Sequence, residues 1–265
     1  MVFNRIRILY LSLCLSNPSV SYLEDMQTKL SGSKHAGVLV SSPLIEYEAA
    51  RRFQWSLCEN RIADSCPDTL VVLEHQPVMT LGRTTKEAHW KGQTDVFKNR
   101  GIQVIACERG GSVTYHGPGQ IVGYPILRLR SFCSGPKTYM RMLEEMIIRV
   151  LAEWGIEGQR VDKLVGVWAA DPQNPIGPLA KIAAMGVKIT RGVTMHGFAL
   201  NATVDLEPFK YIVPCGIEDC RVTSMTELLG SEPDLQLVRD QIADHFAEVF
   251  GIEWTERVTE IPHHS

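Results

Sequence analysis

The sequence predicts an α+β fold in which a mixed β-sheet is flanked by helices. Strand-like apolar runs dominate the middle of the chain, and segments with helical periodicity flank them. Strands and helices do not alternate regularly, as they would in a doubly wound parallel sheet. The chain has 265 residues, of which 45% are hydrophobic, and it shows no internal repeat. One domain with a large packed core is the simplest organisation for a chain of this size.

The N-terminal segment is predicted to precede the folded domain. Two arginines stand before a short apolar stretch, a pattern shared by signal and transit peptides, but the stretch is too short to span a bilayer. The lysine, serine and glycine content of 26–36 is typical of a linker. We therefore expect a leader or an over-extended start over 1–36, a single domain over 37–254 and a tail over 255–265.

The first predicted elements are one helix and three strands. Apolar residues recur every three or four positions over 46–62, which predicts an amphipathic helix. Apolar runs at 70–74 and 78–81 predict two strands, which are separated at Gln76-Pro77 because proline interrupts strand pairing. Another strand is expected over 102–107.

The most distinct helical pattern begins at Pro136, after a predicted strand over 121–127. Proline is tolerated in the first turn of a helix, and Gly155 supplies the residue type that commonly follows the last turn. One apolar stripe runs along this helix, formed by Met140, Leu143, Ile147, Val150, Leu151 and Trp154.

The remaining elements are a hairpin, an extended segment and a final helix. The runs over 161–169 and 179–190 predict two paired strands around a polar loop. The segment over 193–204 is expected to be extended as well. The last helical pattern is stopped by Gly251.

The segment 109–120 is the strongest candidate for a ligand-binding loop. It reads Arg-Gly-Gly-Ser-Val-Thr-Tyr-His-Gly-Pro-Gly-Gln, so four glycines are interleaved with polar side chains. Glycine lets a backbone approach a ligand closely, and the polar residues supply hydrogen-bond donors that an ordinary turn does not need. A tight connection between two strands is the alternative interpretation.

Cys215 and Lys181 are the candidates for covalent chemistry. Pro214 and Gly216 flank the cysteine and place its thiol on a bend, where the N–H groups that follow could face an oxyanion. Lys181 is surrounded by apolar neighbours, and a buried amine beside a thiol could exchange a proton with it. The alternatives are an inert buried cysteine and a lysine at a strand edge that reaches solvent.

Other functions find less support in the sequence. His116 or His196 could pair with Cys215 in a Cys-His hydrolase, and Cys215 with Cys220 is a weak match to zinc-ligand spacing. The chain has neither the phosphate-binding loop Gly-x-x-x-x-Gly-Lys-Ser/Thr nor a Gly-x-Gly-x-x-Gly turn placed for a dinucleotide. Its net charge of -3 argues against nucleic-acid binding, and its seven scattered cysteines suit a reducing, cytoplasmic compartment.

Four strings of the sequence resemble the lipoyl(octanoyl) transferases. They are LEHQPVMTLGR, ERGGSVTYHGPGQIVGYPIL, KIAAMGVKITRGVTMHGFALN and IVPCGI. The resemblance spans roughly 37–251. It implies a fold similar to the catalytic domains of biotin and lipoate protein ligases, and the transfer of an octanoyl group from acyl carrier protein to lipoyl domains.

The resemblance also implies roles for particular residues. The cysteine of Pro-Cys-Gly would carry the acyl thioester, which here is Cys215, and the lysine of Lys-Ile-Ala, here Lys181, would promote its ionisation. The implied substrate-binding residues are Arg109, Gly110, Gly111, Ser112, Val113, Thr114, Tyr115, His116, Ala184, Met185, Gly186, Gly197, Phe198 and Ala199. Phe198 stands where a leucine is common in the family and Met185 where a leucine or isoleucine is common, and either could alter the preferred acyl length.

The implied reaction needs no cofactor, no metal and no nucleotide, because a thioester is already activated. The expected partners are octanoyl-acyl carrier protein as donor, and as recipients the lipoyl domains of 2-oxoacid dehydrogenase E2 subunits and the glycine cleavage H protein. Neither nucleic acid nor a membrane is an expected partner. The rival functions are an ATP-dependent lipoate or biotin protein ligase, a Cys-His hydrolase and a non-catalytic binder of the same protein domains.

Overall fold

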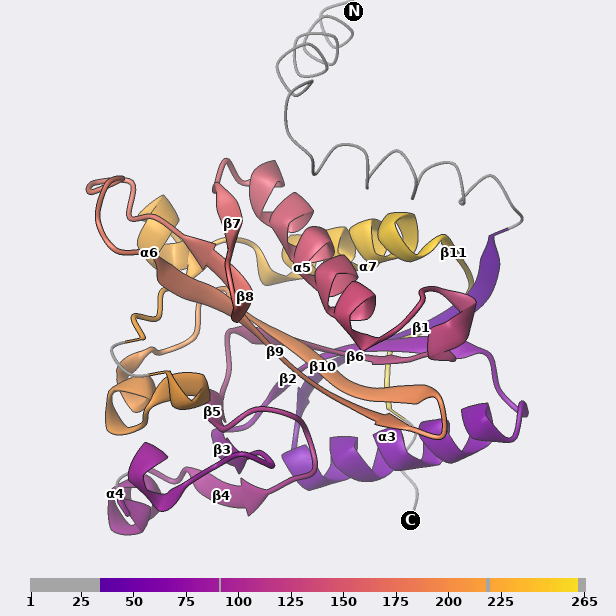
Figure 1. The fold of residues 1–265 in the computed structure, drawn as a ribbon, viewed down its shortest axis with the longest axis horizontal. Coiled ribbons are helices and arrows are strands. Elements are labelled where there is room, and N and C mark those ends of the chain that lie inside the picture. The colour runs from indigo at the N-terminus through magenta and orange to yellow at the C-terminus, as the bar shows by residue number, and fades with distance from the viewer. Residues whose placement is uncertain (1–33, 91, 218–219, 262–265) are drawn as a thin grey trace, which may run out of the picture. The chain divides into compact units, whose positions relative to one another are not determined.

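A computed structural model describes residues 34–90, 92–217 and 220–261 (Figure 1). Most of the predicted leader and the last residues of the predicted tail lie outside these ranges. Strand β1 (His35–Ile45) already begins before position 37, where the domain was expected to start. At the other end, β11 (Ile252–Val258) continues past position 254 and Ile261 packs into a core cluster, so the ordered fold includes part of the predicted tail.

The main β-sheet has eight strands in the order β11-β1-β2-β6-β10-β9-β8-β7. Strands β1 and β2 pair in parallel, whereas β2–β6, β6–β10, β10–β9, β9–β8 and β8–β7 are antiparallel. The remaining strands are β2 (Asp68–His75), β6 (Gln120–Ile126), β7 (Gly158–Val161), β8 (Leu164–Ala169), β9 (Ala180–Thr190) and β10 (Val193–Asn201). The sheet is therefore mixed, as the sequence predicts.

A second sheet is formed by β4 (Gln103–Ala106), β3 (Val78–Leu81) and β5 (Val113–His116), with β3 in the centre. Strand β4 is parallel to β3, and β5 is antiparallel to it. The glycines around β5 predict a ligand-binding loop for this segment. In the structure only its two ends are irregular, and its centre pairs with β3.

Helices cover both faces of the main sheet. Figure 1 shows α3 (Tyr47–Ile62) on one face, and α5 (Pro136–Glu153) with α7 (Leu235–Phe250) on the other. The other two α-helices in the described residues are short: α4 (Thr94–Asn99) and α6 (Met225–Leu229). The prediction of an α+β fold with a mixed sheet between helices is confirmed.

Local sequence explains where the long helices begin and end. The Glu46 carboxylate accepts the N–H groups of the first turn of α3, and Asp234 does the same for α7. Pro136 stands in the first turn of α5, where its missing N–H costs no helical bond. Gly251 ends α7 with a φ of 64°, a left-handed conformation that glycine adopts at little cost.

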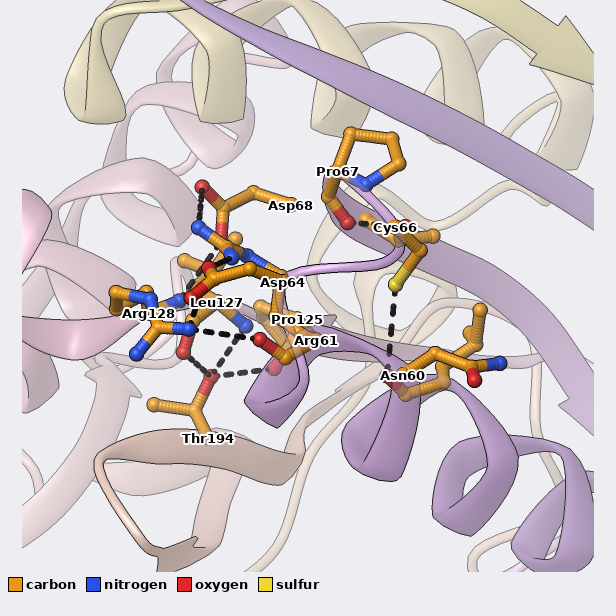
Figure 2. A network of polar contacts seen from close by, with 12 residues as sticks. Asn60, Arg61, Asp64, Cys66, Pro67, Asp68, Pro125, Leu127, Arg128 and Thr194 are labelled. Atoms are coloured by element: carbon orange, nitrogen blue, oxygen red, sulfur yellow. Dashed lines mark hydrogen bonds and ion pairs between the residues drawn. The ribbon is translucent and has the colours of Figure 1, made fainter.

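A polar network joins the end of α3 to the start of β2 and to the end of β6 (Figure 2). The Asp68 carboxylate accepts hydrogen bonds from Arg61 Nε at 2.8 Å and from the main-chain N–H of Arg128 at 2.7 Å. Asp64 accepts from the same two arginines at 2.7 and 2.6 Å. The Thr194 hydroxyl of β10 donates to the Pro125 carbonyl of β6 and accepts the N–H of Leu127, just after that strand. The network therefore fixes α3 and three strands against one another.

Candidate active site

A cavity of about 440 Å³ lies where the main sheet meets the second sheet. Three of the sequence stretches predicted to bind substrate contribute to its wall, and so do both predicted catalytic residues. The predicted residues that line it are Arg109, Gly110, Gly111, Ser112, Thr114, His116, Lys181, Ala184, Met185, Gly186, Gly197, Phe198, Ala199 and Cys215.

Strand pairing explains how two of these stretches meet. In the antiparallel pair β9–β10, Gly186 lies opposite Gly197 and Met185 lies opposite Phe198. The Phe198 ring extends over Gly123 of β6, where a β-carbon would overlap the ring atoms. A β-carbon on Gly197 would overlap the Gly123 carbonyl oxygen. Glycine is therefore required at 123 and 197 for the strands and the ring to pack as they do.

The glycine-rich segment forms the wall that faces β9. The Gly110 N–H donates to the Val187 carbonyl at 2.9 Å, and a β-carbon on Gly186 would lie only 2.9 Å from the Gly110 carbonyl oxygen. The buried Arg109 guanidinium donates to the carbonyl of Thr80 at 2.7 Å and to its hydroxyl at 2.8 Å. The segment is thus fixed to both sheets, and its backbone approaches β9 as closely as glycine allows.

Side chains alternate along β5, so only one face of this strand reaches the cavity. Ser112, Thr114 and His116 line the cavity. Val113 and Tyr115 point the other way, into a hydrophobic cluster of the second sheet. The structure therefore places these two predicted binding residues in the core, because successive side chains of a strand face opposite sides.

Cys215 lies on a tight turn formed by Pro214–Gly216, with a φ of 57°. It is half-buried and its side of the turn faces the cavity. The N–H groups of Gly216 and Ile217 donate to the Val213 and Pro214 carbonyls at 2.9 and 3.1 Å. The expectation that these N–H groups are free for an oxyanion is wrong, because the turn that presents the thiol uses them.

His89 supports this turn, and the sequence analysis did not identify it. Its carbonyl accepts the Val213 N–H at 2.5 Å, and its ring Nδ1 lies 2.5 Å from the Ser112 hydroxyl oxygen. A β-carbon on Gly216 would lie 3.1 Å from His89 Cε1 and 3.2 Å from Ser112 Cβ. Close packing of three segments therefore fixes the turn, and no local sequence pattern indicates it.

Lys181 is 3% exposed, so it does not reach bulk solvent as a strand-edge lysine would. Its main chain pairs with the segment that follows Cys215: its N–H donates to the Arg221 carbonyl at 2.8 Å, and its carbonyl accepts the Thr223 N–H at 3.0 Å. This pairing brings the chain after the cysteine next to the start of β9. As a result, Lys181 and Cys215 line the same cavity although they are far apart in sequence.

Four buried rings line the cavity, those of Tyr47, His116, Tyr124 and His196. Burial lowers the pKa of His75 to about 4 and that of His196 to about 4, and it lowers the pKa of His116 well below its ordinary value. The Tyr124 hydroxyl lies 2.6 Å from His75 Nε2. Tyr47 stacks on His116 with the ring centres 6.2 Å apart. These imidazoles are neutral near pH 7.

The geometry gives little support to a Cys-His pair. His116 Nδ1 lies 2.6 Å from Gln120 Oε1, and its Nε2 lies 3.4 Å from the Thr80 hydroxyl, so both ring nitrogens are engaged within the wall. His196 Nε2 has no hydrogen-bond partner and faces the cavity region. No hydrogen bond joins Cys215 to an imidazole in the part of the chain that the structure describes.

Further residues line the cavity that no sequence motif indicates. They are Tyr47, Val122, Tyr124, Met140, Lys163, Leu164, Val165, Val187 and Ile217. Most of these positions follow ordinary helical or strand periodicity, which does not distinguish a side chain facing a cavity from one facing a core.

Among residues 34–90, 92–217 and 220–261, no group of three or more His, Cys, Asp or Glu side chains is placed to hold a metal ion.

No helix in the described ranges is long and apolar enough to cross a membrane.

Solved structures show the same fold. A bipartite lipoate protein ligase from Thermoplasma acidophilum matches with a TM-score of 0.62 and 18% identity, over 85% of this chain and 88% of that chain. LipL1 from P. falciparum matches with a TM-score of 0.60 and 11% identity, over 82% of this chain and 66% of that one. The predicted likeness to lipoate ligases in fold is confirmed.

Sequence comparisons identify the family. Residues 46–247 match the family described as lipoyl protein ligase A/B catalytic domain. An octanoyltransferase from Koribacter versatilis is 44% identical over 223 residues, covering 82% of this chain and 86% of the relative. An octanoyltransferase from Nostoc punctiforme is 44% identical over 220 residues, covering 83% and 90%. The chain therefore belongs to the lipoyl protein ligase A/B catalytic-domain family, and within it to the octanoyltransferases, which are acyltransferases.

Proposed function

We propose that Cys215 carries the octanoyl group as a thioester and that Lys181 exchanges protons with the reacting thiol and amine. The proposed donor is octanoyl-acyl carrier protein. The proposed recipients are lysines of lipoyl domains, in the E2 subunits of 2-oxoacid dehydrogenases and in the glycine cleavage H protein. The observation that carries the proposal is that one thiol and one amine, both matched to the family pattern, line a single cavity.

In the first step, the Cys215 thiolate attacks the thioester carbonyl of the donor. A carbon–sulfur bond to Cys215 forms and the bond to the carrier's sulfur breaks. The leaving thiolate takes a proton from the Lys181 ammonium, so the carrier departs as a thiol and the lysine becomes neutral. Exchange of one thioester for another is nearly isoenergetic, so this step needs no nucleotide.

In the second step, the recipient amine attacks the acyl-enzyme. A carbon–nitrogen bond forms and the bond between the acyl carbon and the Cys215 sulfur breaks. The neutral Lys181 amine accepts the proton that the attacking nitrogen loses, which restores the thiolate and ammonium pair. Formation of an amide from a thioester is downhill and drives the transfer.

The cavity wall suits an apolar chain near the thiol. Ala184, Gly186 and Gly197 carry small side chains or none, and Phe198 and Met185 supply apolar surface. Burying about seven carbons at roughly 0.8 kcal/mol each gives an upper bound of about 6 kcal/mol for octanoyl binding. This is enough to select an acyl chain of this class, whereas one methylene more or less discriminates by only about 1 to 3 kcal/mol.

The intact mass of the enzyme tests the nucleophile. After incubation with octanoyl-acyl carrier protein we expect one added octanoyl group, absent in Cys215→Ser and present in the control Cys220→Ser. An adduct that persists in Cys215→Ser would reject this nucleophile. Rapid release of the group to water would instead favour a hydrolase, and a dependence on ATP and free octanoate would favour a ligase.

Single-turnover kinetics test the lysine. Lys181→Ala should fold but form the acyl-enzyme more slowly, because the leaving thiolate of the carrier then lacks its proton donor. An unchanged rate at neutral pH would reject the proton-transfer role.

A further inference from the structure

The Lys181 side chain extends along one face of strand β8. A β-carbon on Gly166 would lie 3.2 Å from Lys181 Cε and 3.6 Å from Lys181 Cδ. The lysine methylenes therefore pass over Gly166, and any larger residue there would displace them. Gly166 has a φ of 128°, a backbone conformation that residues with side chains rarely adopt.

The lysine ammonium lies over the indole of Trp168, on the same strand. Lys181 Nζ is 4.8 Å from the centre of the Trp168 ring system. Trp168 is 4% exposed and Lys181 is 3% exposed. The indole face is therefore in cation–π contact with the lysine ammonium.

Strand β8 is held in place by contacts that do not involve the Lys181 side chain. The buried Glu144 carboxylate of α5 accepts the Gly166 N–H at 3.1 Å. Its other oxygen accepts hydrogen bonds from Arg141 at 2.8 Å and Arg160 at 3.2 Å. Trp168 pairs directly with Lys181 across β8–β9, next to an irregularity in the register. The position of the indole is thus set by α5 and the sheet.

We propose that Trp168 is a positioning residue for acyl transfer, whose indole face holds the Lys181 ammonium at the wall of the catalytic cavity. Gly166, which has no side chain, leaves room for the lysine methylenes. The inference rests on the proposed role of Lys181. Trp168 itself does not line the cavity, and its contact with the proposed reacting groups is the one with the Lys181 ammonium. Its effect on the rate should therefore pass through Lys181 alone.

A double-mutant cycle tests this coupling. We expect Trp168→Leu to slow acyl-enzyme formation by about 5- to 30-fold, which corresponds to the loss of one desolvated cation–π contact. In a Lys181→Met background, which keeps the length of the side chain, the same change should have almost no further effect. An equal loss in both backgrounds would show a merely structural role and overturn the proposal.

Conservative variants keep the test decisive if Trp168→Leu folds poorly. Trp168→Tyr and Trp168→Phe retain an aromatic face, so each should keep more activity than Trp168→Leu or Trp168→Met, with the change in kcat rather than in KM. Equal rates for aromatic and aliphatic variants would overturn the proposal.

Lys188→Met is the matched control, because it removes the ammonium that lies 4.4 Å from the Trp55 ring and should leave acylation unchanged. If Lys181→Met alone has no effect, it is the role proposed for Lys181 that fails.

Discussion

Phe198 and Gly123 show how single residues shape the cavity. The phenylalanine ring occupies the space that a side chain at 123 would need, and it also lines the cavity. The ring is 2% exposed and is held between neighbouring strands, so it has little freedom to move aside. We therefore infer that its volume limits the space available to the acyl chain.

Phe198→Leu should shift the acyl preference toward longer chains. The smaller side chain enlarges the cavity, so the ratio of kcat/KM for a decanoyl donor to that for an octanoyl donor should rise about tenfold. Phe209→Leu is the control, since Phe209 packs in the hydrophobic cluster of the second sheet and does not line the cavity. A ratio that stays constant in Phe198→Leu, or rises equally in the control, would contradict this role.

At the scale of elements, the network in Figure 2 joins helix α3 to strands β2 and β6. Its two carboxylates contact the same arginines but differ in burial: the Asp68 side chain is 7% exposed and that of Asp64 is 69% exposed. A buried charge whose partner is removed costs far more than an exposed one, because water cannot replace the lost contact. The two positions therefore form a natural pair for comparison.

Asp68→Ala should destabilise the fold by about 3 kcal/mol, because it leaves Arg61 Nε and the Arg128 N–H without their acceptor. Asp64→Ala should leave the unfolding midpoint almost unchanged, since solvent reaches its site. Urea unfolding of both variants measures the difference. Equal losses would show that burial does not decide the strength of this network.

At the scale of the whole molecule, burial of three neutral histidines links stability to pH. Their pKa values are lowered in the folded protein, mainly by loss of hydration. The unfolded chain binds protons at the ordinary pKa of about 6.5, where the folded protein does not. The unfolded state therefore gains protons first as the pH falls, and stability decreases from about pH 6.5 toward pH 4.

The unfolding free energy should fall by on the order of 2 kcal/mol for each of His75 and His196 between about pH 7 and pH 5. Urea titrations across this range measure the slope. His196→Gln, which cannot titrate, should have a shallower slope even if it is less stable at every pH. The same slope in this variant would show that other groups cause the pH dependence.

The sequence predicted the three long helices but not every strand. Helices α3, α5 and α7 carry a repeating apolar stripe and recognisable ends, and both kinds of signal are local. Strand β5 was missed because glycines surround it, and β11 because its half-exposed residues show no apolar run. Such strands are stabilised by pairing with distant segments, which periodicity does not reveal.

The sequence by itself determined the fold class, the family and the two residues proposed for the chemistry, because local periodicity and short motifs carry that information. Only the tertiary structure decided which face of β5 meets the cavity, that the N–H groups after Cys215 are occupied, and that Trp168 lies beneath Lys181. Strand register and side-chain facing depend on contacts between segments far apart in the chain, and a shift of one residue would turn each side chain to the other face.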